Sequence, residues 1–312
     1  MTATPLFDEA FLGRVRRLTL LSGRVRAEGL VGEHRSRRRG SSPEFADFKN
    51  YSQGDDFRRI DWNTYGRLDS LFVRLSEVTT ELSVHLLLDA SDSMDWGGAG
   101  GARTKFTYAR QVAGALGYVA LWHFDRLAIA PFGPDLDHMF GPAQGRANVV
   151  PMLRYLETLQ TRPGTSLAES IERYVRARRR PGVAILISDL LAGEPDDLRA
   201  ALRTLRARGW HAVVIQTLDE AEIAPEPAGR YLTGDATTAR PLVELIDLES
   251  GERLRLTADD DLLGRYARAV GGWLDAIETA ANDEEAIYIR LLTSRPFDDL
   301  ALESLHRLGV VA

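Results

Sequence analysis

Short apolar runs that alternate with segments of helical periodicity constrain the fold of this 312-residue chain more than any other feature. Each run is long enough for a strand buried on both faces. The runs cover residues 82–88, 126–132, 183–187, 211–217 and 286–292, and the helical segments 104–124, 147–159, 166–178, 196–208 and 259–281. This alternation predicts an α/β fold: a mainly parallel sheet with right-handed crossovers and helices on both faces.

The first 81 residues lack this alternation. Apolar residues at helical spacing predict an amphipathic helix from Phe7 to Val25, followed by an Arg-rich arm at residues 35–39. We expect residues 1–81, with this helix, the arm and an extended segment, to pack on a main domain, residues 82–312. That domain is expected to end in a hairpin (243–256), a helix, a strand and a helix after Pro296.

Charge is distributed unevenly along the chain. The net charge is -6, but the first 40 residues carry +5 and the remaining residues carry -11. An acidic body argues against specific nucleic-acid binding over the whole surface. Attachment of the arm to nucleic acid or to an anionic membrane stays open as an added function. We prefer a solvated arm whose positive charge balances the negative charge of residues 41–312.

The absence of cysteine excludes disulfides and thiolate chemistry. The amino terminus lacks the apolar core of a signal peptide. No apolar stretch approaches the roughly 20 residues that span a bilayer. We therefore expect a cytoplasmic protein with no transmembrane segment.

Oxygen-bearing side chains collect where the predicted strands end, which is where open parallel sheets place their ligands. Asp89, Ser91 and Ser93 follow the first strand as Asp-x-Ser-x-Ser, Thr165 precedes a helix, and Asp189 follows the strand at 183–187. These five hard donors suit Mg²⁺, with Mn²⁺ as an alternative. The two carboxylates would balance a dication and leave it able to attract an acidic residue of a partner protein.

Taken singly, each of these three elements would more often cap a helix or close a turn. Together and in this order, all five positions match the metal-ion-dependent adhesion site of von Willebrand factor A domains. Residues 82–218, and by extension the chain to 292, therefore resemble that family. The resemblance implies a Rossmann-type sheet and a site that binds a partner protein through a bridging cation.

A second pattern precedes the sheet: Tyr-x-x-Gly-Asp-Asp-x-Arg-x-Ile-Asp-Trp, from Tyr51 to Trp62. It resembles the bacterial domain-of-unknown-function 58 family, whose members carry a von Willebrand factor A-like domain. Genes of that family often neighbour those of MoxR-type AAA+ ATPases, which implies such an ATPase as a partner. Many members also carry membrane spans ahead of this region, an anchor that we do not expect here.

The acidic, basic and aromatic residues of this second pattern have two interpretations. We prefer a structural network that braces the amino-terminal segment against the sheet, with acids and Arg buried beneath Trp62. Binding of a partner is the alternative. The residues concerned are Asp55, Asp56, Arg58, Asp61 and Trp62.

The function expected from these features is a non-enzymatic, Mg²⁺-dependent adaptor that works with a MoxR-type AAA+ ATPase in protein remodelling or maturation. The alternative is a Mg²⁺-dependent hydrolase or phosphotransferase that uses Asp89. Enzymes of the haloacid dehalogenase type would need a second Asp in place of Ser91 and a lysine beyond Lys105, and the chain has neither.

The glycine-rich segment 97–105 lacks the ending of a phosphate loop, so we expect it to form a flexible rim beside the metal site. The six histidines show no zinc-site spacing.

Overall fold

The computed structural model describes residues 6–16, 45–51, 60–68, 70–76, 82–97, 103–132, 139–163, 166–178, 180–224, 242–246, 253–257 and 260–295. The chain divides into two compact units. One comprises Met1–Val31 and Leu82–Ala312, and the other Gly32–Glu81. The first 31 residues thus group with the main unit, whereas the sequence-based division places them with residues 32–81.

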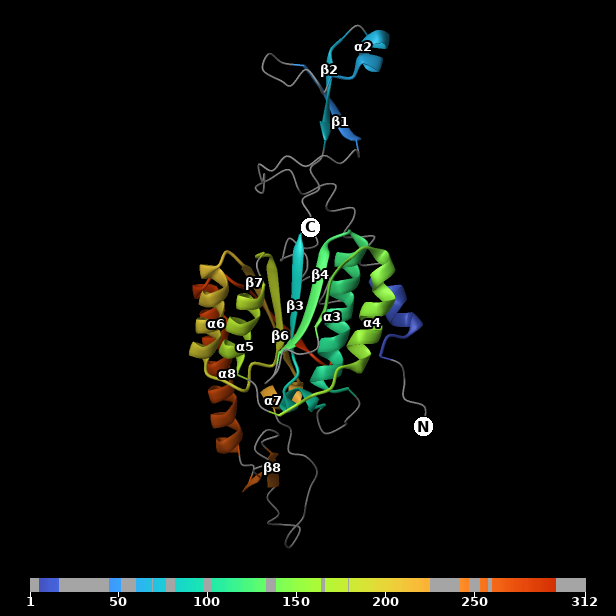
Figure 1. Ribbon diagram of the computed structural model, residues 1–312. Helices are drawn as coiled ribbons and strands as arrows, with labels where there is room; N and C mark the ends of the chain where they lie inside the picture. Colours follow the sequence, from blue (N-terminus) through green and yellow to red (C-terminus); the bar gives the residue numbers. More distant parts are fainter. Residues whose placement is uncertain are drawn as a thin grey trace. The chain divides into compact units, whose positions relative to one another are not determined.

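The main unit is built on a six-stranded sheet in the order β10-β7-β6-β3-β4-β5 (Figure 1). Its strands are β3 (Ser83–Asp89), β4 (Arg126–Phe132), β5 (Phe140–Gln144), β6 (Val183–Ser188), β7 (His211–Leu218) and β10 (Ile287–Leu292). All neighbouring strands pair in parallel except β5, which runs antiparallel to β4. The predicted, mainly parallel sheet is confirmed.

Helices cover both faces of the sheet, as predicted (Figure 1). On one face lie α3 (Lys105–Trp122) and α4 (Val149–Thr158). On the other lie α5 (Leu167–Ala177), α6 (Pro195–Ala207) and α8 (Asp260–Asp283). Alternation along β3 explains the two layers, because Leu86 and Leu88 join the apolar cluster of α3 while Leu87 joins that of α5 and α6.

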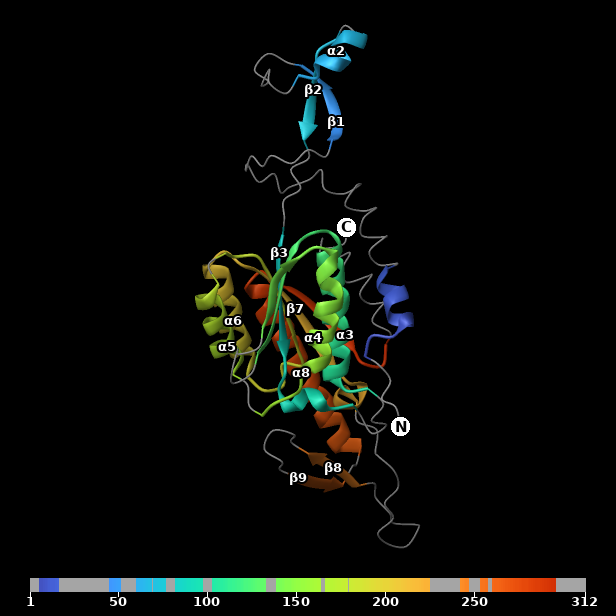
Figure 2. The same cartoon turned by 45° about the vertical axis from the view of Figure 1, so that its right-hand side comes forward.

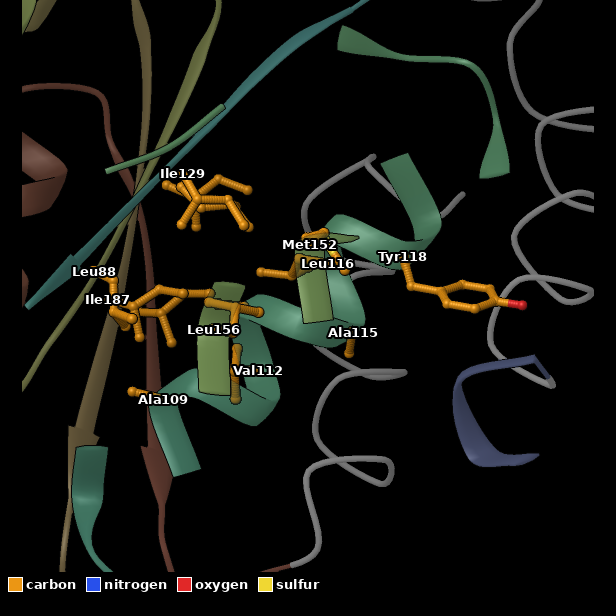
Figure 3. Close-up of a cluster of buried hydrophobic side chains, with 14 of the residues drawn as sticks. Leu88, Ala109, Val112, Ala115, Leu116, Tyr118, Ile129, Met152, Leu156 and Ile187 are labelled. Carbon is orange, nitrogen blue, oxygen red and sulfur yellow. The ribbon is translucent and has the colours of Figure 1, made fainter. Parts of the chain in front are cut away.

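The cluster between the sheet and α3 is apolar throughout. Figure 3 shows Leu88, Ile129 and Ile187, from three neighbouring strands, together with side chains of α3 and α4. The labelled helical residues are Ala109, Val112, Ala115, Leu116, Tyr118, Met152 and Leu156. Because apolar side chains fill this layer, the polar groups of β3 and β6 are concentrated where these strands end.

Residues 6–16 cover the outer side of α3 (Figure 2). Residues 9–16 are helical, and Phe11 and Val15 are fully buried. The side-chain amide of Gln111 in α3 donates to the carbonyl of Leu6 at 3.0 Å. The predicted amphipathic helix therefore docks on the main unit over this stretch, while residues 17–25, the arm at 35–39 and the last predicted helix lie outside the described residues.

The smaller unit contains an antiparallel pair, β1 (Phe45–Asn50) and β2 (Phe72–Ser76), and the helix α2 (Trp62–Leu68). We did not predict these elements from the sequence. The register of the pair shifts between Phe45 and Asp47. The sequence of β1 itself shows no clean alternation of polar and apolar residues. A second hairpin, β8 (Leu242–Ile246) with β9 (Arg253–Thr257), belongs to the main unit and confirms the predicted hairpin.

Three short elements complete the main unit. They are the 3-10 turns η2 (Asp92–Asp95) and η3 (Arg146–Asn148) and the helix α7 (Glu220–Ile223). Within the described part of the chain, no helix is both long enough and apolar enough to cross a membrane.

Gly182 allows the chain before β6 to pass close to the start of β3. A Cβ at position 182 would lie 2.2 Å from the carbonyl oxygen of Ser83 and 2.8 Å from its Cβ. We expect Gly182→Ala to lower the free energy of unfolding by about 1–3 kcal/mol, because backbone would have to move. Gly264→Ala in α8, where no atom lies within 4 Å, should instead raise it by about 0.5–1 kcal/mol. Urea unfolding of both variants measures the contrast, and equal effects would refute it.

His85 is buried in β3 beside Tyr174 and Trp210. Its Nδ1 lies 2.6 Å from the Tyr174 hydroxyl, and its ring centroid lies 4.6 Å from that of Trp210. Burial, helped by the positive charges of Arg178 and Arg126, lowers the pKa of His85 from 6.5 to about 4. Between these two values the unfolded chain binds the proton and the folded chain does not, so stability falls as the pH falls.

We therefore expect the free energy of unfolding to fall by about 2–3 kcal/mol from pH 7 to pH 4 because of the titration of His85. Urea unfolding at a series of pH values measures this slope. His85→Gln should flatten it, whereas His211→Gln, at the exposed start of β7, should retain it. Identical slopes for the wild type and His85→Gln would contradict the assignment.

Candidate metal centre

The loop after β3 gathers three of the predicted metal ligands. Asp89 ends the strand, and its Oδ1 accepts a hydrogen bond from the backbone N–H of Ser91 at 2.9 Å. The hydroxyl oxygens of Ser91 and Ser93 lie 2.9 Å apart. A carboxylate that accepts the amide two residues later closes a tight turn. This turn sets the two hydroxyls side by side after the carboxylate.

Asp189 lies at the same edge of the sheet because β6 is the parallel neighbour of β3. The hydroxyl of Ser188, the last residue of β6, donates to Oδ2 of Asp89. Asp189 is fully buried, and its Oδ1 accepts the backbone N–H of Leu191 at 3.0 Å. The fold therefore brings the ends of both strands together, as the sequence pattern predicts.

The two carboxylates influence each other. Burial, and next the negative charge of Asp189, raises the pKa of Asp89 to about 6, although hydrogen bonds from Ser188 and Ser91 act in the opposite direction. Like charges in a poorly solvated place are stabilised by a nearby cation. The charge and the oxygen donors of the loop are thus compatible with a divalent ion such as Mg²⁺.

Thr165 lies outside the described residues, but the chain on either side of it meets the site. The backbone N–H of Arg162 donates to the carbonyl of Ala90 at 2.7 Å, and Arg162 forms a parallel bridge with Ser91. Ser166 caps α5 by accepting the backbone N–H of Glu169. The segment that contains Thr165, the second element of the motif, is therefore tied through Arg162 to the loop after β3.

A cavity of about 200 Å³ lies beside Asp89. Its polar lining includes Asp89, Ser188 and Ser166, and its apolar lining includes Phe132 and Leu190. Asp89 itself is only 3% exposed. The nearly buried Asp89 thus forms part of the cavity wall, whereas Ser91 and Ser93 do not line the cavity.

Lys105 is a residue of this site that we did not predict from the sequence. It begins α3, its side chain is fully buried, and its Nζ lies 2.6 Å from Oδ2 of Asp189 and 2.5 Å from Oε1 of Glu222. Burial by itself lowers the pKa of Lys105, but the two carboxylates more than offset this and hold the pKa above its ordinary value. The available signal was its rarity, since the chain has two lysines.

Glu222 is the other unpredicted residue, and the available sequence signal was Asp219 three positions before it, the spacing of a helix-capping box. Its Oε2 accepts the backbone N–H of Asp219 at 2.9 Å, which closes a capping box on α7. Burial raises the pKa of Glu222, while the charge of Lys105 acts in the opposite direction. The hydroxyl of Tyr266 donates to the carbonyl of Glu222 at 2.6 Å, so α8 holds this residue in place.

The pattern ahead of the sheet is described only in part. Asp61 is buried at the start of α2, where its Oδ1 accepts the backbone N–H of Thr64 at 3.2 Å. Trp62 is 63% exposed and lies edge-on to Tyr65. Asp55, Asp56 and Arg58 lie outside the described residues, so the network that we expect beneath Trp62 stays a prediction.

Within the described ranges, no group of three or more His, Cys, Asp or Glu side chains could hold a metal ion. The expected donor set differs from such a cluster, because it combines two carboxylates with hydroxyls. Asp89, Ser91 and Ser93 lie together as that set requires. Asp189 lies beside them, with both carboxylate oxygens already in contact with hydrogen-bond donors.

The chain is similar to proteins of several organisms. Uncharacterized proteins of Mycobacterium bovis and Mycobacterium tuberculosis are 29% identical to it over 268 residues, which are 84% of this chain and 78% of each relative. The crystal structure of an aerotolerance-related membrane protein from Bacteroides fragilis matches 72% of this chain and 97% of its own, at 15% identity and a TM-score of 0.43. The model of the family described as "Protein of unknown function DUF58" matches residues 47–271. This match covers well over half of the sequence, and the chain therefore belongs to that family.

Proposed function

We propose that this chain is a Mg²⁺-dependent protein-binding adaptor, in which Mn²⁺ can replace Mg²⁺. The observation that carries the proposal is the hydrogen-bonded loop after β3, which places Asp89, Ser91 and Ser93 together at the carboxyl edge of the sheet. These are hard oxygen donors, and two of the three are uncharged. A cation held by them would still attract an anionic oxygen.

The cavity beside Asp89 supports a role for a partner in completing the site. Its wall contains polar groups, which would suit a cation and the partner's carboxylate bound to it. The wall also contains the apolar side chains of Phe132 and Leu190. Binding sites commonly combine an apolar lining with a few polar groups that fix orientation. An acidic residue of a partner protein is therefore the group that we propose to enter here.

The partner that we propose is a MoxR-type AAA+ ATPase or a client of one, met in the cytoplasm during protein remodelling or maturation. Membership of the family supports this choice, because genes of that family often neighbour genes for such ATPases. The adaptor would bring a client to the ATPase, and the cation would bridge the adaptor and its partner reversibly.

An enzyme that uses Asp89 as a nucleophile is supported less well. In enzymes of the haloacid dehalogenase type, such chemistry uses a free lysine in addition to Mg²⁺ to stabilise the phosphoryl group. Lys105 contacts two carboxylates, and Asp89 Oδ2 accepts the hydroxyl of Ser188. These contacts favour binding over phosphoryl transfer.

Removal of the cation or of Asp89 should abolish capture of the partner. We expect affinity capture from the native host to recover an AAA+ ATPase or its client with Mg²⁺, and to lose it with a chelator or with Asp89→Ala. The loss should be about 10-fold or more, which corresponds to about 1.4 kcal/mol of binding free energy. Mass spectrometry of the captured proteins gives the measurement.

Asp95→Ala is the matched control, since Asp95 is an exposed carboxylate in the adjacent turn η2. It should capture the same proteins as the wild type. Circular dichroism checks that Asp89→Ala is folded, and Asp89→Asn provides a second variant of similar shape. Capture that ignores both the chelator and these substitutions would rule out the cation-bridged mechanism.

A phosphatase assay separates the adaptor from the enzyme alternative. We expect no turnover of p-nitrophenyl phosphate or acetyl phosphate with Mg²⁺ above the rate shown by Asp89→Ala, because Lys105 is already paired with carboxylates. Turnover by the wild type that disappears in Asp89→Ala, but not in Asp95→Ala, would establish the enzyme instead.

A further inference from the structure

Lys105 places a positive charge inside the candidate metal centre. Its ammonium contacts Asp189 at 2.6 Å and Glu222 at 2.5 Å, and its side chain has no exposed surface. It begins α3 directly after Thr104, whose side chain caps the helix by accepting the backbone N–H of Thr107. The charge is therefore carried by a well-anchored helical turn.

This ion pair changes the charge that a cation would meet. The ammonium, which Asp189 shares with Glu222, engages one carboxylate oxygen of Asp189, and the other oxygen accepts the backbone N–H of Leu191. Asp89, in contrast, accepts hydrogen bonds from uncharged donors, Ser188 Oγ and the backbone of Ser91. Of the predicted ligands that the structure describes, Asp89 is thus the carboxylate whose contacts leave its negative charge in place.

Glu222 gives the ammonium of Lys105 a second carboxylate contact. It approaches Lys105 from α7, and its position is fixed by the backbone of Asp219 and by the hydroxyl of Tyr266 in α8. Two carboxylates on elements distant in the sequence therefore share one ammonium. A lysine held in this way acts as a fixed counter-charge.

We propose that Lys105 is a positioning residue whose ion pair holds Asp189 away from direct contact with the cation, so that Asp89 is the carboxylate that binds the cation. Among its direct ligands, which are Asp89 and neutral hydroxyls, a dication then has one positive charge uncompensated, and the carboxylate of the partner supplies the missing negative charge. Cation and partner then strengthen each other's binding by the same factor. The inference rests on the proposed Mg²⁺-dependent function and explains why the metal would bind tightly only with a partner.

Binding of Mn²⁺ to the full chain without any partner tests this role. Lys105→Met removes the charge and keeps an unbranched stem, while Lys105→Gln also keeps an N–H donor for Asp189. We expect both variants to bind Mn²⁺ about 10-fold more tightly than the wild type, because Asp189 loses its ion pair and becomes available to the cation. Electron paramagnetic resonance of unbound Mn²⁺ gives the affinity. A lysine with a structural role alone would not produce this gain.

Two further variants locate the origin of the gain. The double variant Lys105→Met/Asp189→Asn should lose it, because Asp189 is the source of the added negative charge. Lys49→Met changes the other lysine, which belongs to the unit Gly32–Glu81, and should bind Mn²⁺ as the wild type does. If the single variants do not fold in chelator, Mn²⁺ should restore their folded circular dichroism spectrum.

Mn²⁺ affinity that is unchanged or weaker in the folded single variants, or a failure of Mn²⁺ to restore unfolded ones, would overturn the role of Lys105. The proposed function would survive that result if partner capture still required Mg²⁺. Capture that is indifferent to the chelator would instead remove the proposed function, whatever the Mn²⁺ affinities.

Discussion

Burial of β3 and β6 on both faces is the constraint on which the rest of the structure depends. Their side chains alternate between two apolar layers, so charged groups are placed where the strands end. Because the two strands are parallel neighbours, Asp89 and Asp189 meet at one edge with like charges and little solvent. The fold must supply positive charge there. Lys105 supplies part of it, and the proposed cation supplies the remainder.

The sheet, its covering helices and the loop after β3 could be predicted because each leaves a local or periodic mark in the sequence. Continuous apolar runs identify strands covered on both faces, and periodicity identifies the helices between them. Asp89, Ser91 and Ser93 lie within five consecutive positions, and the end-of-strand rule brings Asp189 to the same edge. Topology alone therefore brings these residues together.

The charge pairs of the site could not be predicted in this way. Lys105 is separated from Asp189 by 84 positions and from Glu222 by 117, and no periodic pattern records which carboxylate a buried ammonium will meet. The smaller unit was missed for a different reason. Its strand β1 carries charged residues at Asp47 and Lys49, so it lacks the continuous apolar run that marks the strands of the sheet.

The shape of the ammonium at position 105 also bears on how this chain can vary. All but two of its 39 basic residues are arginines, so composition alone would favour a guanidinium at this position as well. A guanidinium is planar, broad and fixed in its fork of donors, whereas an ammonium is compact and can point N–H groups at two carboxylates from a closed space. An arginine at position 105 would keep the sign of the charge, but its guanidinium would not fit the closed space at the start of this helix. A change in base composition that favours arginine codons should therefore leave this lysine in place.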